Sequence, residues 1–354
     1  MKKIFFLYIL AIQVSFAQAP FKSEEVNYWN TADSAHIFGT LTMPENGSKF
    51  PAVLLITGSG TQDRDETILG HKPFKVIAEY LTGRGFTVLR VDDRGAGKTT
   101  LGKNPKAITS ENFAKDVKSG IDYLKTRSEI NSKKIGLIGH SEGGMIAPMV
   151  ASQTKDVAYI VSLAGTGVNG KIVAGSQIEI MRIKAGFDTL TAREFVGFND
   201  KVLDIIINED DPKVIEAKVK TLLGTYTDDF KIKNKIIGQD QAVIKSALNS
   251  NIPWVKFFMG HDPAEDWQKV KCPVLALNGT KDTQVDANLH LPAIENALKK
   301  GKNKHYKIVK LEGLNHLFQH AETGLVNEYA KIKEDFAPEA LQIMGDWLLE
   351  TTKK

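Results

Sequence analysis

The chain has 354 residues, of which 42% are hydrophobic and 25% are charged, a balance typical of globular proteins and unlike that of disordered or collagen-like chains. The net charge of +4 is small for this length, and it argues against a basic surface that binds nucleic acid. The single cysteine, Cys272, excludes an internal disulfide.

The first residues have the three-part pattern of a secretory signal. Lys2 and Lys3 precede an apolar stretch at 4–16, and small residues follow it. The stretch is too short to cross a bilayer comfortably. We therefore expect residues 1–17 to be removed as a signal peptide, cleaved after Ala17. The mature protein would be periplasmic or extracellular and would keep no stable membrane span. An N-terminal membrane anchor or a buried helix is the alternative interpretation.

Short apolar runs alternate with amphipathic helical patterns along most of the chain. Residues 24–43 alternate polar and apolar side chains, which favours an antiparallel start. Such alternation predicts an α/β fold in which helices cover both faces of a mostly parallel sheet. The strands are expected at 52–56, 86–91, 135–138, 157–163, 274–277 and 306–311, and the helices after Pro73 and over 110–127, 142–153, 287–300 and 336–350.

Residues 166–268 interrupt this alternation. Strand-like runs largely disappear there, and apolar residues take helical spacing, as at Ile215, Val219 and Leu222. The length of the insertion favours a helical cap over the site rather than an ordinary crossover connection. The chain is thus divided into a first part of the core at 18–165, the cap, and a second part of the core at 269–354.

Residues 139–143 read Gly-His-Ser-Glu-Gly, a G-x-S-x-G motif between a strand pattern and a helix pattern. That context is the one a nucleophile elbow requires, a turn so sharp that only glycine fits beside the strained serine. Ser141 would project above the sheet at a helix N-terminus, where free N–H groups favour negative charge. We therefore predict Ser141 as a nucleophile, a structural Gly/Ser turn being the alternative.

A serine hydroxyl needs a base beside it and a carboxylate that orients the base. In sheets with a nucleophile elbow, these follow the serine in the order acid, then histidine. Asp282 and His316 each follow a predicted strand, so both are expected at the same sheet edge as Ser141. Asp286 is the fallback for the acid and His320 the rival for the base. Alternatively, Asp282 only caps the helix that follows it.

The developing oxyanion also needs hydrogen-bond donors. We predict the backbone N–H of Glu142 as one donor and that of Ser59 as the other, with Gly60 as second choice. The sequence holds no H-E-x-x-H or C-x-x-C pattern, and the Gly-Lys-Thr at 97–99 lacks the earlier glycine of a phosphate-binding loop. We therefore expect no metal and no cofactor.

Several stretches of the chain together match one known group. The chain resembles bacterial α/β hydrolases of the carboxylesterase group that includes the EstD-like esterases, related to the serine aminopeptidase-like (S33-type) hydrolases. The resemblance implies the α/β-hydrolase fold, a helical cap, and hydrolysis of carboxylic esters with short acyl chains by Ser141, Asp282 and His316. The resemblance leaves the charged residues at 62–65 and 93–95 without a role. We expect charged pairing there that braces the loop at 57–60, called the oxyanion loop because it includes the predicted donor Ser59. The matching stretches are ITGSGTQDRDE (56–66), LRVDDRGAGKT (89–99), LIGHSEGG (137–144), PWVKFFMGHDP (253–263), CPVLALNGTKDTQV (272–285) and LEGLNHLFQ (311–319).

The sequence thus predicts a serine hydrolase that cleaves small-molecule carboxylic esters through an acyl-enzyme intermediate. Trp254, Phe257 and Phe258, near the end of the insertion, form either an apolar wall for the acyl group or part of the core. A peptidase or aminopeptidase-like enzyme, or a thioester hydrolase, on the same fold is one alternative. A non-catalytic binding protein that keeps the fold is another. Nothing in the sequence indicates an oligomeric state.

Overall fold

A computed structural model describes residues 21–353 of the chain, so the predicted signal peptide lies outside the described residues. The strands are β1 (Phe21–Asn30), β2 (Ala35–Pro44), β3 (Phe50–Ile56), β4 (Thr87–Val91), β5 (Ile130–His140), β6 (Ile160–Leu163), β7 (Val274–Gly279) and β8 (Tyr306–Leu311). The helices of the core are α1 (Pro73–Thr82), a 3-10 turn at Pro105–Ala107, α2 (Ser110–Thr126), α3 (Glu142–Ala151), α11 (Ala287–Lys300), α12 (Val326–Tyr329) and α13 (Pro338–Lys353). Between β6 and β7 lie α4 (Gly170–Lys184), α5 (Thr189–Asn208), α6 (Pro212–Gly224), α7 (Asp228–Lys233), α8 (Asp240–Asn249), α9 (Pro253–Gly260) and α10 (Pro263–Trp267).

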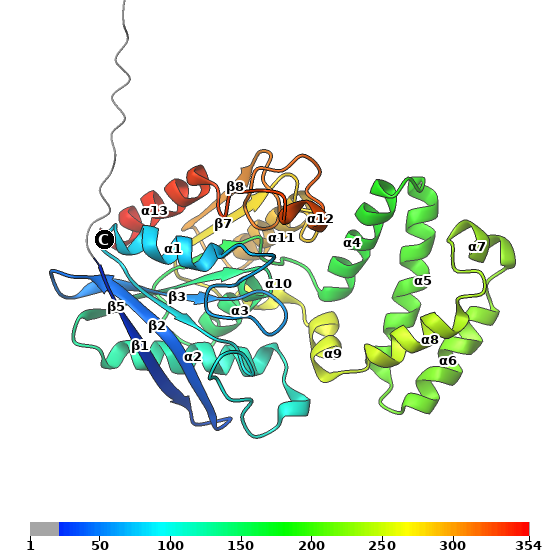
Figure 1. The fold of residues 1–354 in the computed structure, drawn as a ribbon, viewed down its shortest axis with the longest axis horizontal. Helices are drawn as coiled ribbons and strands as arrows, with labels where there is room; N and C mark the ends of the chain where they lie inside the picture. Colours follow the sequence, from blue (N-terminus) through cyan, green and yellow to red (C-terminus); the bar gives the residue numbers. More distant parts are fainter. Residues whose placement is uncertain (1–20, 354) are drawn as a thin grey trace, which may run out of the picture.

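The strands of the described chain form one sheet in the order β1-β2-β4-β3-β5-β6-β7-β8 (Figure 1). The β1–β2 and β2–β4 pairs are antiparallel, and all later pairs are parallel. The mostly parallel sheet with an antiparallel start is therefore confirmed. Because β3, β5, β6, β7 and β8 run the same way, their carboxyl ends meet at one edge, where open α/β sheets hold their sites.

Two layers of helices bury the sheet. Along β3, Leu54 packs with Ile121 of α2 and with α3 on one face, whereas Val53 and Leu55 pack with α1 and α13 on the other. Successive side chains of a strand point to opposite faces, so a strand covered on both faces is apolar at every position. This is why the run at 52–56 lacks polar alternation.

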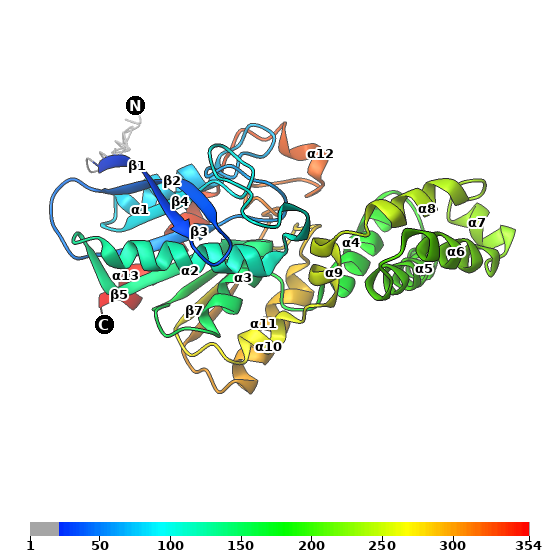
Figure 2. The same cartoon turned by 90° about the horizontal axis from the view of Figure 1, so that it is seen from below.

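The described elements between β6 and β7 are all helices. Of these, α5, α6 and α8 enclose an apolar cluster of their own, which includes Phe198, Val202, Ile215 and Val219. Figures 1 and 2 show α5–α8 extending away from the sheet, α10 lying against the sheet domain, and α4 and α9 lying between the two. The insertion therefore has its own core and meets the sheet domain through its first helix and its last ones. Within residues 21–353, no helix is both long and apolar enough to span a membrane.

Candidate active site

Ser141 lies at the turn between β5 and α3 in a strained conformation, with φ 53° and ψ −115°. The glycines on either side permit this turn. A Cβ on Gly139 would lie 2.0 Å from the carbonyl oxygen of Gly143, and one on Gly143 would lie 2.1 Å from that of Ile56. Such a backbone is kept only when the surrounding structure enforces it, and it is a feature of functional sites. The serine stands at the N-terminus of α3, on the wall of a cavity.

Asp282 and His316 meet at the same sheet edge. Asp282 Oδ2 lies 2.7 Å from His316 Nδ1, and both residues are buried. The other oxygen, Oδ1, accepts the backbone N–H groups of Gln284 and Val285 at 2.8 and 2.9 Å, which fixes the carboxylate. With Nδ1 bonded to the carboxylate, Nε2 is the nitrogen left for other chemistry.

His316 lines the same cavity as Ser141, which has a volume of about 420 Å³. Among the described residues, the Ser141 hydroxyl makes no hydrogen bond of its own. The predicted nucleophile and the predicted base thus line one cavity.

The two residues considered as substitutes have other partners. Asp286 caps α11 by accepting the backbone N–H of Asn288 at 2.9 Å. His320 is exposed and lies 2.9 Å from carboxylate oxygens of both Glu334 and Glu339. Neither Asp286 nor His320 is among the described residues that line the cavity.

Of the predicted oxyanion donors, Ser59 lines the cavity, whereas Glu142, the first residue of α3, is not among the described lining residues. Gly58 also lines the cavity, whereas Gly60, with φ 101°, is not among its lining residues. The Gly58 N–H already donates to Glu66 Oε1 at 2.7 Å. The N–H groups of Ser59 and Glu142 have no acceptor among the described residues, so both are available to a ligand.

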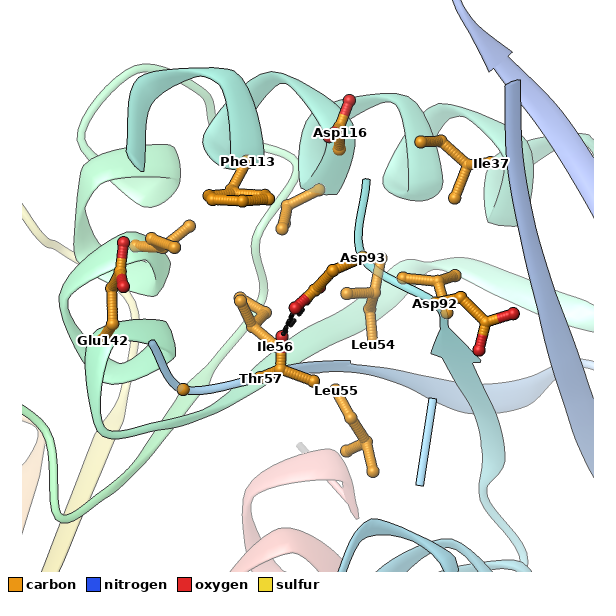
Figure 3. A pocket seen from close by; sticks show the side chains of 14 residues that line it. Ile37, Leu54, Leu55, Ile56, Thr57, Asp92, Asp93, Phe113, Asp116 and Glu142 are labelled. Carbon is orange, nitrogen blue, oxygen red and sulfur yellow. Dashed lines mark hydrogen bonds between the residues drawn. The ribbon is translucent and has the colours of Figure 1, made fainter. Parts of the chain in front are cut away.

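Behind this loop lies a small internal cavity of about 30 Å³, shown in Figure 3. Asp93 points into it and accepts the Thr57 hydroxyl at 2.8 Å and the Gln62 N–H at 3.0 Å. Desolvation raises the pKa of Asp93 well above its ordinary value, although these hydrogen bonds work in the opposite direction. Asp93 thereby holds the start of the oxyanion loop from beneath.

Further charged pairs tie the same loop to the sheet. Arg64 forms a two-point pair with Asp92, with Nε–Oδ1 and Nη2–Oδ2 distances of 3.1 and 2.7 Å. Asp65 pairs with Arg90 of β4. The expected charged pairing is present at Arg64 and Asp65. Arg94 of the second loop pairs instead with Asp33 and Asp116, so among the described residues the two loops do not form charge pairs with each other.

The side chain of Glu142 also makes contacts at this site. Its buried carboxylate accepts the Ser110 hydroxyl at 2.6 Å and the Trp254 indole N–H at 2.9 Å. Trp254 belongs to α9, so this bond joins the last part of the insertion to the elbow.

The three aromatic residues of α9 differ in what they contact. Trp254 and Phe258 line the cavity and stack on each other at a ring distance of 5.2 Å. Phe257 is not among the lining residues, because its ring stacks on His261 at 5.1 Å. The structure thus brings two of the three predicted wall residues to the site.

Sequence reasoning missed four residues of this site. Three of them line the cavity: Gln177 of α4, Gln284 of the loop after β7, and Tyr329 of α12. The fourth, Glu66, accepts the Gly58 N–H of the oxyanion loop. Gln284 and Glu66 lie inside motifs that the sequence analysis had singled out, so their positions were a usable signal. Gln177 and Tyr329 lie in segments without a motif.

Residues 21–353 contain no group of three or more His, Cys, Asp or Glu side chains that could hold a metal ion. The ionisable residues of the cavity are instead engaged with protein atoms, as described for Glu66 and His316.

Comparison with known proteins identifies the relatives. The family model described as serine aminopeptidase, S33, matches residues 72–322, more than half of the chain. Esterase EstD of Thermotoga maritima is 28% identical over 287 residues, which cover 79% of this chain and 57% of EstD, so the chain spans little more than half of that relative's length. Cutinase 2 of Thermobifida cellulosilytica is 25% identical over 230 residues, covering 63% of this chain and 74% of the cutinase.

Solved structures share the fold. An esterase of Pyrococcus furiosus superposes with a TM-score of 0.53 at 16% identity, covering 93% of this chain and 91% of that one. A hypothetical protein of Pseudomonas aeruginosa gives a TM-score of 0.57 at 16% identity, covering 95% and 94%. The fold is that of the α/β hydrolases, and the chain belongs to the serine aminopeptidase S33 family.

Proposed function

We propose that this protein is a serine carboxylesterase that hydrolyses esters of small molecules through an acyl-enzyme intermediate. One observation carries the proposal: the 2.7 Å hydrogen bond between Asp282 and His316 lies on the cavity that also holds Ser141 at its strained turn. A nucleophile, a base and a carboxylate that orients the base are what acyl transfer requires. The relatives named esterase and cutinase support the same class of reaction.

In the proposed mechanism, the Ser141 hydroxyl attacks the ester carbonyl carbon while His316 Nε2 takes its proton. Asp282 keeps the proton on Nδ1 and stabilises the imidazolium that forms. The N–H groups of Glu142 and Ser59 bind the oxyanion. His316 then passes the proton to the leaving alcohol, and a water molecule activated by the same histidine releases the acid.

The cavity walls suggest where the acyl part and the alcohol part of the ester bind. Trp254, which donates to Glu142 beside the elbow, and Phe258, which stacks on Trp254, form an apolar wall suited to a short acyl group. On the His316 side, Gln284 donates to the Tyr329 hydroxyl at 3.1 Å and presents neutral polar groups to the alcohol part. A volume of about 420 Å³ suits a small ester.

Aminopeptidase activity is the second candidate, because the family carries that name. An aminopeptidase must bind the substrate's free ammonium group, which calls for a carboxylate facing it. Among the described residues that line the cavity, Glu66 is the one carboxylate, and it is buried against Gly58 and His140. The cavity therefore favours a neutral ester. Turnover of leucine p-nitroanilide faster than that of p-nitrophenyl acetate would favour the aminopeptidase.

The decisive experiment is a series of p-nitrophenyl esters of increasing acyl length, measured with the wild type and Ser141→Ala. We expect the wild type to prefer short chains and the variant to lose at least about 10³-fold in kcat. A fluorophosphonate probe should label the wild type and not the variant. Ser119→Ala, at a half-buried position of α2 that does not line the cavity, serves as the matched control. Full activity in Ser141→Ala would remove the proposal, and a folded wild type inert to the probe would favour a binding protein.

A further inference from the structure

Glu66 and His140 form a buried pair directly behind the elbow, and the mechanism above uses neither side chain. His140 Nδ1 lies 2.9 Å from Glu66 Oε1, and His140 Nε2 lies 2.9 Å from the carbonyl oxygen of His316. Glu66 is 1% exposed and His140 is 4% exposed. Glu66 also adopts a positive φ of 52°, which is uncommon for a residue with a side chain.

The atoms around His140 decide its protonation. A neutral imidazole has one N–H donor, yet both ring nitrogens here face oxygens that accept hydrogen bonds. One is the Glu66 carboxylate, which already accepts the Gly58 N–H at 2.7 Å, and the other is the His316 carbonyl. Both bonds are complete only when the ring carries two protons. The bonding therefore indicates a buried imidazolium paired with a carboxylate.

The surrounding charges agree with this. Burial, the largest single effect, opposes the charged ring, but the Glu66 carboxylate, the hydrogen bond to the His316 main chain and Asp282 together raise the pKa of His140. The ring of His316 packs on that of His140 at 4.7 Å. Asp93, beneath the oxyanion loop, is the other carboxylate whose charge interacts with Glu66.

The pair joins three segments that are far apart in the sequence. Glu66 Oε1 holds Gly58, which directly precedes the proposed oxyanion donor Ser59. His140 directly precedes Ser141. Its other nitrogen holds the main chain of His316, the proposed base. One charged pair thus connects the loop of the oxyanion donor, the nucleophile and the base.

We infer that Glu66 and His140 are positioning residues, an imidazolium–carboxylate pair that keeps the oxyanion loop and His316 in register across the nucleophile elbow. This inference rests on the proposed esterase function. It differs from a merely structural ion pair because it acts on groups that bind the transition state, so its loss lowers kcat more than it raises KM.

The first test is Glu66→Gln, which keeps the shape and removes the charge. We expect kcat for p-nitrophenyl acetate to fall about 10²-fold while KM changes less than about threefold. The matched control is Asp266→Asn. Asp266 is also buried and lies 3.0 Å from a histidine, His261, but neither residue lines the cavity. The control should keep kcat within about twofold. Equal kcat values for the two variants would overturn the inference.

The second test reads the proton directly and does not depend on the variant's activity. Ring-nitrogen NMR of the wild type near neutral pH should show both nitrogens of His140 protonated, with the signals assigned by their loss in His140→Gln. In Glu66→Gln, one nitrogen of His140 should become unprotonated. An unprotonated His140 nitrogen in the wild type would overturn the imidazolium. If the wild type instead lacks esterase activity and fluorophosphonate labelling, the proposed function fails, whatever the NMR signature of the pair.

Discussion

Asp282 and Asp286 are four residues apart in one loop, yet they have different partners. Asp282 binds the imidazole of His316, whereas Asp286 caps α11. The difference is one of backbone direction: Asp282 follows the buried end of β7, and Asp286 begins the helix that leads away from it. A carboxylate beside a histidine nitrogen fixes the tautomer that a general base needs.

At this scale we predict that Asp282→Asn lowers kcat for short esters by on the order of 10⁴-fold, because an amide favours the wrong imidazole tautomer. The measurement is steady-state turnover of p-nitrophenyl acetate together with thermal unfolding. Asp286→Asn makes the same chemical change and keeps a good helix cap, so it should retain both activity and stability. A greater loss of activity in Asp286→Asn than in Asp282→Asn would mean that Asp286, and not Asp282, is the acid that orients His316.

At the scale of elements, α12 contributes Val326 and Tyr329 to the cavity wall, and the turn before it leads into this helix. Glu328 holds this turn by accepting the backbone N–H groups of Glu322, Thr323 and Gly324 at 2.6, 3.0 and 2.9 Å. Gly324 must be glycine, since its φ is 73° and a Cβ there would lie 1.8 Å from the carbonyl oxygen of Lys281. The turn is therefore packed directly against the loop that carries Asp282.

The Glu328 carboxylate makes the stability of this turn dependent on pH. The hydrogen bond from the Thr323 hydroxyl and those from the backbone lower the pKa of Glu328 to about 2, against a smaller opposing effect of burial. Because the pKa of Glu328 is lower in the folded than in the unfolded protein, its ionised carboxylate stabilises the folded state. This stabilisation is fully present above pH 4.5, the pKa in the unfolded chain, and it is lost as the pH falls through about 2.

We therefore predict that Glu328→Gln lowers the Tm by about 2 °C at pH 7, and that the difference from the wild type narrows below about pH 5. Thermal unfolding across pH 2–7 measures it. Glu322→Gln is the control, because its exposed side chain accepts no hydrogen bond from the described residues. A Tm difference that stays constant down to pH 2 would contradict the assigned charge.

At the scale of the whole molecule, the chain builds separate apolar cores. Two clusters fill the faces of the sheet, and a third lies among α5, α6 and α8. In that third cluster, Phe198 meets Tyr226 and Phe230 at ring distances of 5.1 and 6.0 Å. Within the insertion, α4 and α9 line the cavity, whereas α5, α6 and α8 enclose the third cluster, so we expect the outer helices to unfold locally without disturbing the elbow.

We predict that Phe198→Ala destabilises the insertion by about 3–5 kcal/mol, the cost of removing a buried phenylalanine. Hydrogen exchange should then become faster in residues 189–249 and stay unchanged in β3 and β5. Leu190→Ala removes an exposed apolar side chain from the same helix and should leave exchange unaltered. Equal loss of protection in the sheet would mean that the insertion and the core unfold as one unit.

The sequence by itself determined what local chemistry dictates. The strand, the two glycines and the helix around Ser141 lie within a few residues of one another, so the strained turn could be predicted from its own segment. Asp282 and His316 were predicted from chain order, because strands of a parallel sheet end at one edge.

Only the tertiary structure decided which residues meet across long separations. Glu66 and His140 are 74 positions apart, and no periodicity or spacing relates them. Phe257 and Phe258 are adjacent, yet helix geometry points them about 100° apart, and only the packing of α9 decides which of them faces the cavity. Local sequence sets the conformation of a segment, whereas the partner of a side chain depends on how whole elements are placed.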